Sequence, residues 1–381
     1  MTILALVGKH HLDFIENSRP LEGFMARREV IPAVEDTDTP TLSARQERVL
    51  RAVVGSYVGG GSPVGSSTIA QLLPVNLSAA TIRSVMSELS ELGLLGKSHA
   101  SAGRVPTELG LRVFVTQLLA RRDLGDYERR DIADAMEDVH GDAVMRVASD
   151  VLSRHTHQLG FAVTPRLERL VLRHASLVRL STAHILVVLV SQSGVAHRCL
   201  IDDAGSSDQA DLDRIASALN DRIAGRTLPE AREALAQEVR ALRSQADRFR
   251  ARALRIAERA LAAVPGGPGD LVIGTWLALL DQPEFRDPER LRALHRAIET
   301  EERLVALLDE ILKRDAGPRV AFSEEIGEPA LRHCALVVAP YGGARAPLGV
   351  LGVVGPSRMD YARVIPLVDY LSQLVTERLQ A

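Results

Sequence analysis

The segment from Leu42 to Thr107 constrains the fold most, because start and stop signals for helices follow one another closely in it. Ser43, with Gln46 three residues later, has the capping-box pattern that begins a helix. The glycines at 59–61 would end that helix, because glycine readily takes the left-handed conformation found after a last helical turn. We therefore expect a first helix between Ser43 and these glycines.

Two more helices and a hairpin are predicted in the same segment. A short helix begins near Ser66 and ends at Pro74, and Ser78 then has the position of an N-cap. An apolar stripe at helical spacing follows it: Ile82, Val85, Met86, Leu89 and Leu92. Gly93 ends this third helix, and the polar stretch 94–107 has the pattern of a β-hairpin. Two helices joined by a short turn and followed by a hairpin are typical of a winged helix-turn-helix.

Charge is distributed unevenly along the chain. The whole sequence has a formal net charge of -3, whereas residues 42–122 carry a net charge of +5. The cations of this segment are Arg45, Arg48, Arg51, Arg83, Lys97, Arg104, Arg112, Arg121 and Arg122. A local excess of cations in an acidic chain indicates that a polyanion binds there. The segment has only two aromatic residues, Tyr57 and Phe114, on which single-stranded bases could stack, so duplex DNA is the favoured partner.

The predicted third helix presents small polar side chains and one cation to solvent. Small residues let a helix approach base edges in the major groove, and Arg83 can pair with guanine or with phosphate. The candidate base-reading residues are Ser78, Ala79, Thr81, Arg83, Ser84 and Ser87. The same pattern is also consistent with an exposed helix of a protein-interaction module.

The hairpin and the start of the second helix supply candidate phosphate contacts. Cations and hydroxyls at these places can bind the DNA backbone, and helix N-termini favour phosphate. The candidates are Ser66, Ser67, Thr68, Lys97, His99, Ser101 and Arg104. For the three residues of the second helix, ordinary helix capping is an alternative explanation.

After Arg122 the sequence alternates between helical and strand-like segments. Residues 126–159 are helical in pattern, and strand-like runs follow, including the β-branched run ILVVLV at 185–190 that is typical of a central strand. Residues 206–265 have the pattern of a long amphipathic helix, and strand patterns return at 333–359 before a closing helix. This order predicts an α+β domain interrupted by an insertion.

No pattern in the sequence supports catalysis, metal binding or a membrane span. Cys199 and Cys334 lie in separate apolar segments and are predicted to be reduced core residues. His155 and His157, two positions apart, would point to different sides of a helix and make a poor metal pair. The segment 349–360 lacks the ending of a phosphate-binding loop, so its glycines are predicted to be structural. We expect no catalytic residue, no metal, no cofactor and no membrane association, and a cytoplasmic location.

Three separated segments resemble one protein family. Residues 42–66 (LSARQERVLRAVVGSYVGGGSPVGS), 77–107 (LSAATIRSVMSELSELGLLGKSHASAGRVPT) and 354–368 (VGPSRMDYARVIPLV) are similar to the HrcA family of heat-inducible transcription repressors. The resemblance runs from about residue 42 to the C-terminus. In the hairpin, Ser98 and Ala100 stand where the family often has proline and threonine.

The resemblance implies a multidomain α+β protein with a winged-helix DNA-binding domain, a GAF-like α/β domain and an inserted, mainly helical dimerisation domain. We place a flexible extension at 1–41, the DNA-binding domain at 42–122, the GAF-like domain at 123–205 and 281–381, and the insertion at 206–280. The resemblance also implies a homodimer that binds an inverted-repeat operator in double-stranded DNA, the CIRCE element, upstream of chaperone genes. It further implies that the GroE chaperonin promotes repression, and that heat relieves it.

Two alternative functions remain open from the sequence. One is a winged-helix regulator whose GAF-like domain senses a small molecule, although no convergent set of polar residues marks such a site. The other is a protein-interaction scaffold that binds no DNA, against which the +5 charge of residues 42–122 argues.

Overall fold

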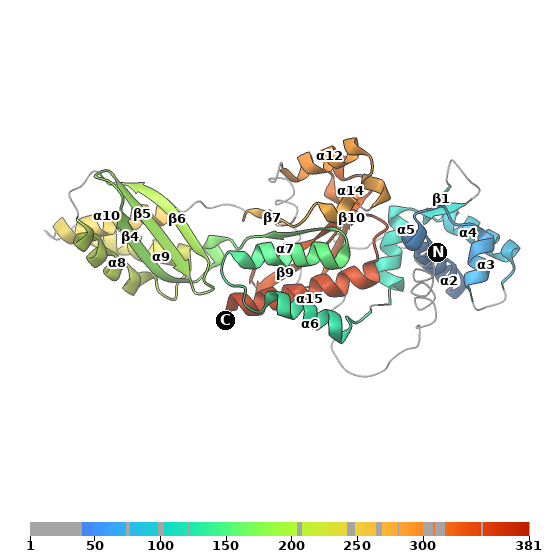
Figure 1. The fold of residues 1–381 in the computed structure, drawn as a ribbon, viewed down its shortest axis with the longest axis horizontal. Helices are drawn as coiled ribbons and strands as arrows, with labels where there is room; N and C mark the ends of the chain where they lie inside the picture. The colour runs from blue at the N-terminus through green and yellow to red at the C-terminus, as the bar shows by residue number, and fades with distance from the viewer. Residues whose placement is uncertain are drawn as a thin grey trace.

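The structure, a computed structural model, describes residues 40–380 apart from gaps at 74–76, 98–102, 121, 204–207, 242–247, 264–268, 281, 300–307, 309–316 and 344–345. Three groups of elements follow one another along the long axis of the molecule (Figure 1). We call them the N-terminal group (residues 44–106), the middle group (126–163 with 271–380) and the distal group (172–262). The predicted extension at 1–41 lies almost entirely outside the described residues.

The N-terminal group has the predicted order of three helices and an antiparallel hairpin: α2 (Ala44–Gly60), α3 (Ser66–Leu72), α4 (Ala79–Glu91), β1 (Leu95–Lys97) and β2 (Arg104–Pro106). The capping box at α2 is confirmed, since Ser43 Oγ accepts from the Gln46 amide and Gln46 Oε1 accepts from the Ser43 amide. The helix ends at the glycine run, where Gly61 has a left-handed φ of 62°.

The apolar stripe predicted for α4 is confirmed at four of its five positions. The buried residues are Ile82, Val85, Met86 and Leu89. Leu92 is 39% exposed, which contradicts its inclusion in the stripe. The helix ends at Glu91 and Leu92 is its C-cap, so the Leu92 side chain no longer continues the helical face.

Two short helical segments lead from the hairpin to the middle group: α5 (Glu108–Val113) and the π-helical η1 (Phe114–Leu118). A Cβ atom at Gly110 would lie 2.1 Å from the carbonyl oxygen of Leu94, so only glycine lets α5 pack this closely on the hairpin. Buried side chains of η1 join the N-terminal and middle groups in one apolar core.

An antiparallel five-stranded sheet forms the middle group, in the order β7-β3-β10-β9-β8. Its strands are β3 (Leu159–Val163), β7 (Leu271–Ile273), β8 (Arg319–Phe322), β9 (Cys334–Gly343) and β10 (Ala346–Pro356). The helices α6 (Asp126–Met136), α7 (Ala143–Thr156) and α15 (Tyr361–Gln380) lie on one side. The other side is covered by α11 (Leu277–Leu280), η4 (Pro283–Phe285) and α12 (Pro288–Glu299). The sheet is therefore buried on both faces.

The glycines of β10 are structural, as predicted for segment 349–360. A Cβ atom at Gly352 would lie 2.2 Å from the carbonyl oxygen of Val337, and one at Gly355 would lie 2.1 Å from Gln158 Oε1. Close packing against the backbone of β9 requires glycine at 352, whereas Gly355 leaves room for the Gln158 side chain. Cys199 and Cys334 are both unpaired, and Cys334 is buried in the core.

Residues 172–202 form strands, but not in the sheet with which the sequence analysis grouped them. β4 (Leu172–Arg179), β5 (His184–Ser191) and β6 (Ala196–Asp202) pair with one another in a separate three-stranded sheet. One face of that sheet packs on three helices, α8 (Gln209–Ile223), α9 (Leu228–Ala241) and α10 (Arg248–Ala262), in an apolar core of its own. Within the described part of 206–265, where one long helix was predicted, the chain forms α8, α9 and α10, and α8 ends before Gly225 at φ 76°.

Shorter elements complete the described chain: η2 (Leu167–Arg169), α14 (Ser323–Ile326) and η5 (Pro329–Leu331). None of the helices in the described part of the chain is long and apolar enough to cross a membrane.

Candidate nucleic-acid interface

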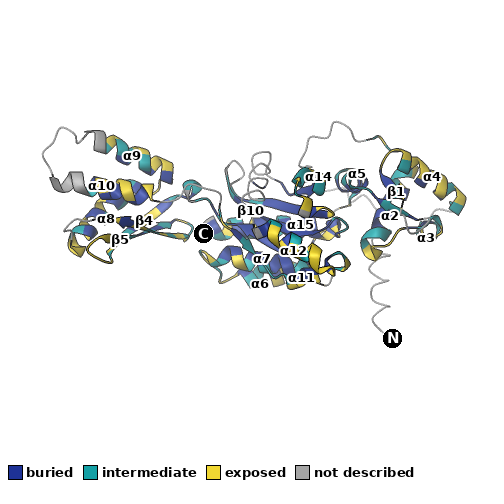
Figure 2. Cartoon of the chain, turned by 90° about the horizontal axis from the view of Figure 1, so that it is seen from above, coloured by how far each residue is buried: buried dark blue, intermediate teal, exposed yellow. Residues whose placement is uncertain are grey.

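One side of α4 is a continuous polar face on the outside of the N-terminal group (Figure 2). Its exposed residues recur at helical spacing: Ala80, Arg83, Ser84, Ser87, Glu88 and Glu91. Three of the predicted base-reading residues, Arg83, Ser84 and Ser87, therefore lie together on this face. Their exposure follows directly from the burial of the opposite apolar stripe in the core.

The other three predicted residues of this helix have different positions. Ser78 is the N-cap, whose Oγ accepts a hydrogen bond from the Thr81 amide at 3.1 Å and lies 2.9 Å from Thr81 Oγ1. Both hydroxyls are thus engaged in starting the helix, and Ala79 is half-buried. Ala80, which the sequence analysis omitted, is exposed one turn before Arg83 and Ser84. Applying the helical period strictly would have selected Ala80 instead of Ala79.

The exposed face of α4 changes charge along its length. Arg83 lies in the N-terminal half, whereas Glu88 and Glu91 are exposed near the C-terminal end. Glu88 Oε2 accepts a hydrogen bond from Gln46 Nε2 at 3.1 Å, which links α4 to the start of α2. A polyanion would consequently be attracted to the N-terminal half of α4 and repelled from its end.

The two described cations of the hairpin lie opposite each other but differ in exposure. Lys97 pairs with Arg104 in the register of β1 and β2, and the Lys97 side chain is exposed. Arg104 is half-buried, and its Nε donates to Ser90 Oγ at 3.2 Å, which braces the hairpin against α4. This bond uses Nε, so a phosphate contact from Arg104 would be made by its Nη atoms. The predicted residues His99 and Ser101 lie outside the described residues.

The loop between α2 and α3 supports the returning strand of the hairpin. Val64 exchanges two backbone hydrogen bonds with Arg104, at 2.8 and 2.9 Å. A Cβ atom at Gly103 would lie 2.8 Å from Pro63 Cβ, so the glycine beside Arg104 permits this close packing. The base of the hairpin is therefore tied both to α4 and to the loop before α3.

Three hydroxyl side chains occupy the first turn of α3. Ser67 and Thr68 are exposed and Ser66 is half-buried. The N-cap position is Gly65, and no side-chain hydrogen bond caps this fully described helix. Capping therefore does not account for the three hydroxyls.

Not all cations of the +5 segment face solvent. Arg45, Arg48, Arg83, Lys97 and Arg122 are exposed. Arg112 instead forms an ion pair with Glu325 and lies over the Phe322 ring, 5.8 Å from its centroid. Arg112 thus belongs to the contact with the middle group, a role that local charge counting does not reveal.

The histidines of α7 and its end do not form a metal pair. His155 Nε2 lies 3.2 Å from Asp131 Oδ2, and burial lowers the pKa of His155 although the Asp131 carboxylate opposes this. His157 is the C-cap of α7, with a left-handed φ of 54°. Among the described residues, no three His, Cys, Asp or Glu side chains gather as metal ligands would.

Comparisons with known proteins find similar sequences over most of the chain. A family model described as the HrcA protein C terminal domain matches residues 142–365. A heat-inducible transcription repressor HrcA of Syntrophobacter fumaroxidans is 36% identical over 341 residues, which cover 89% of this chain and 98% of the relative. The protein of the same name from Xanthomonas axonopodis pv. citri is 34% identical over 346 residues, covering 91% and 98%.

The fold also has a solved relative. A crystal structure of a hypothetical protein aligns with a TM-score of 0.55 at 21% sequence identity, covering 89% of this chain and 99% of that one.

Proposed function

The chain belongs to the HrcA family of heat-inducible transcription repressors, and we propose that its N-terminal group is a winged-helix domain that reads operator DNA with α4. The observation that carries the proposal is the exposed face of α4, where Arg83 stands among small side chains. Such a face fits the major groove, because small residues allow close approach and arginine bonds the acceptor pair of guanine.

The backbone contacts proposed beside α4 come from two places. Lys97 lies on β1 of the hairpin that would act as the wing on flanking phosphates, and the same role is proposed for His99 and Ser101, which lie outside the described residues. Ser67 and Thr68, exposed on the first turn of α3, would bond a neighbouring phosphate through their hydroxyls. These contacts fix the register of the protein on DNA, while α4 supplies the sequence preference.

We propose a division into domains that follows the sheets. The DNA-binding domain remains at 42–122. The GAF-like domain consists of about 123–170 and 271–381, and the insertion of about 171–270, because β4, β5 and β6 pair among themselves and share a core with α8 to α10. The insertion is therefore a sheet covered by helices and not a purely helical unit.

The proposed homodimer would form through the face of the distal sheet that α8 to α10 leave uncovered. An apolar row crosses all three strands there, since Val178 pairs with Leu186 and Leu186 with Leu200. Leu200 is 59% exposed and Val178 38%. A second copy of the same face would cover this row, which suits the symmetric contact of a dimer.

The remaining parts of the proposal rest on the family alone. They are a CIRCE-type inverted-repeat operator before chaperone genes, promotion of repression by the GroE chaperonin, and action in the cytoplasm. Apolar side chains cover both described faces of the five-stranded sheet, so a small-molecule site on either face has no comparable support.

Replacing Arg83 tests the proposal. Arg83→Ala should weaken binding to an inverted-repeat chaperone promoter by about 1–3 kcal/mol and relax the preference at one base pair per half-site. Fluorescence anisotropy with promoter and scrambled duplexes, at two salt concentrations, measures both effects. Arg130→Ala, which removes an equally exposed arginine from α6, is the matched control and should change neither. Undiminished discrimination between the two duplexes by Arg83→Ala would refute base reading by α4.

A further inference from the structure

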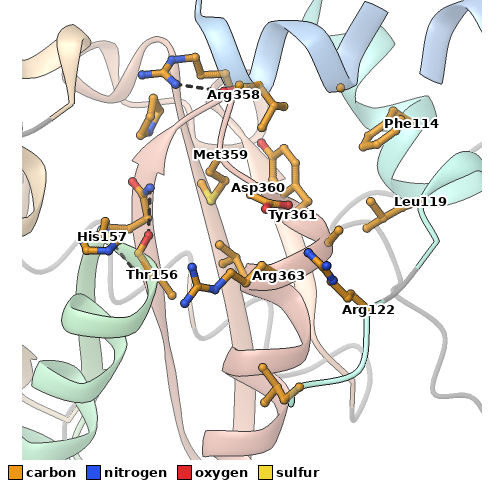
Figure 3. Close-up of a pocket in the computed structure, with 18 of the residues that line it drawn as sticks. Phe114, Leu119, Arg122, Thr156, His157, Arg358, Met359, Asp360, Tyr361 and Arg363 are labelled. Carbon is orange, nitrogen blue, oxygen red and sulfur yellow. Dashed lines mark hydrogen bonds between the residues drawn. The ribbon is translucent and has the colours of Figure 1, made fainter. Parts of the chain in front are cut away.

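Arg358 connects the N-terminal group to the middle group at the place where the two meet. It lies in the turn between β10 and α15, within the GPSRMDY segment. A cleft of about 880 Å³ opens beside it, lined by residues of α2, η1, α7 and the start of α15 (Figure 3). Arg358 Nη1 donates to the carbonyl oxygen of Val58 at 3.3 Å. The arginine thus reaches from the middle group to the last turn of α2.

The carbonyl that Arg358 binds is one that a helix cannot satisfy by itself. The last four carbonyl groups of a helix have no partner within it, and a cation near them is favourable. α2 has no basic residue in its own last turn, so Arg358 supplies the missing charge from another domain. A Cβ atom at Gly61 would lie 3.3 Å from Arg358 Nε, so glycine there leaves room for the guanidinium group.

The middle group holds the Arg358 guanidinium in place. Nε and Nη2 donate to the two carboxylate oxygens of Glu284, the latter at 2.9 Å, and Nη2 also donates to Gln282 Oε1 at 3.2 Å. Burial raises the pKa of Glu284, but the hydrogen bonds and charge of Arg358 outweigh this and keep the pKa below its usual value. Only 14% of the arginine side chain is exposed. A bidentate, part-buried pair of this kind has a fixed direction, unlike a surface ion pair.

A second polar contact lies on α5. Glu108 accepts a hydrogen bond from Ser323 Oγ, and Arg112 pairs with Glu325. The Arg358 contact lies on α2 of the N-terminal group, and this second contact lies on α5, which packs on the hairpin of that group through Gly110. Two such points define an orientation, whereas one would permit rotation about the apolar joint at η1.

We propose that Arg358 is a positioning residue for DNA recognition: it sets the direction of α2, and with it α4, relative to the rest of the subunit. This inference rests on the proposed function as a DNA-binding dimer. α4 follows α2 because the two helices share the apolar core and the Gln46–Glu88 hydrogen bond. In a dimer joined at the distal groups, the direction of α2 determines the separation of the two α4 helices. Arg358 would therefore determine which spacing of half-sites the repressor accepts.

The dependence of affinity on half-site spacing distinguishes a positioning role from a loss of stability. A dimer bridges half-sites whose separation matches its recognition helices, and one added base pair moves a half-site by roughly 3.4 Å and turns it around the duplex. A rigid junction discriminates between spacings, whereas a loose one accepts several. Partial unfolding would instead lower binding to all duplexes by the same factor.

The experiment compares full-length wild-type, Arg358→Ala and Arg358→Lys proteins. Anisotropy titrations use the inverted repeat with its natural spacer, with the spacer one or two base pairs shorter or longer, and a single half-site. We expect wild type to prefer the natural spacer by about tenfold, or about 1.4 kcal/mol. Arg358→Ala should reduce the preference to below about threefold and keep its half-site affinity within about twofold. Arg358→Lys, which cannot form the bidentate pair, should fall between them.

Arg332→Ala is the control, because Arg332 is exposed on the same group and should leave the spacer preference intact. An unchanged preference in Arg358→Ala, or an equal loss on every duplex including the half-site, would overturn the positioning role. If wild type binds no inverted repeat, the proposed function fails instead. The distance distribution between labels at Glu91→Cys and Gln373→Cys then decides without DNA: it should broaden in Arg358→Ala, and an unchanged width would overturn the inference.

Discussion

The five-stranded sheet of the middle group and the three-stranded sheet of the distal group are buried to different extents. In the middle group, β9 and β10 lie between helices on both sides, and their side chains divide between two apolar clusters. In the distal group, β5 alternates between buried and half-buried residues, because helices cover only one face. Figure 2 shows the same contrast, with dark blue dominating the middle sheet and lighter colours on the distal one.

This difference in burial indicates which sheet can contact a partner molecule. A sheet covered on both faces has no apolar surface left for a partner, so its side chains serve the fold. The distal sheet keeps the row Val178, Leu186 and Leu200 on the face that none of the described helices covers, where a second molecule could bury it. We therefore propose that the middle sheet serves the fold and the distal sheet serves dimer assembly, and single substitutions can test this proposal.

The largest effect is expected at the centre of the middle sheet. Val337 is 0% exposed on β9, so Val337→Asp would place a carboxylate in the apolar core. We expect the free energy of unfolding to fall by about 4 kcal/mol or more, enough to prevent folding in a marginally stable chain. Denaturation followed by circular dichroism measures this loss. Val337→Ala, which only removes volume, should lower the free energy of unfolding by about 2 kcal/mol. An equally small loss for Val337→Asp would show that water reaches this position of the middle sheet.

A smaller and local effect is expected on the covered face of the distal sheet. Val187 is also 0% exposed, but it belongs to the separate core shared with α8 to α10. Val187→Asp should lower the stability of the distal group by about 3 kcal/mol and leave the middle group folded. Hydrogen exchange read by mass spectrometry distinguishes the two groups. Faster exchange in β9 and β10 as well would mean that the two cores unfold as one.

Sequence patterns predict the local features of this fold better than those that depend on distant contacts. The helices α2 and α4, their N-caps Ser43 and Ser78, and the exposed position of Arg83 follow from signals within a few residues, and the structure has them as predicted. Ala79, predicted on the solvent side, is half-buried, and Leu92, predicted in the apolar stripe, is exposed; both lie at helix ends, where the periodicity ceases.

Features that depend on distant partners were not predicted. ILVVLV at 185–190 is the central strand β5 as expected, but nothing in it shows which sheet it joins, because strand pairing involves residues far apart in sequence. The bond from Arg104 to Ser90 and the contact from Arg358 to Val58 are equally invisible in sequence. The sequence places Arg358 in the GPSRMDY segment but does not reveal that it contacts α2.

The smallest effect on stability, together with a clear effect on dimer assembly, is expected at Leu186. Leu186 is half-buried on the uncovered face, between Val178 and Leu200. Leu186→Asp should change the stability of each subunit by no more than about 1 kcal/mol, because the carboxylate stays in water in the monomer. In a dimer the same carboxylate would be buried against its own copy, so the dimer should dissociate.

Sedimentation velocity over a range of protein concentrations measures this dissociation. Leu186→Val, which keeps the surface apolar, should remain as dimeric as wild type. Because two half-sites need two joined subunits, Leu186→Asp should also lose the affinity that the inverted repeat gains over a single half-site. If Leu186→Asp remains a dimer, this face does not form the dimer interface. The contrast between residue 186, expected to affect assembly, and residue 187, expected to affect stability, would then be lost.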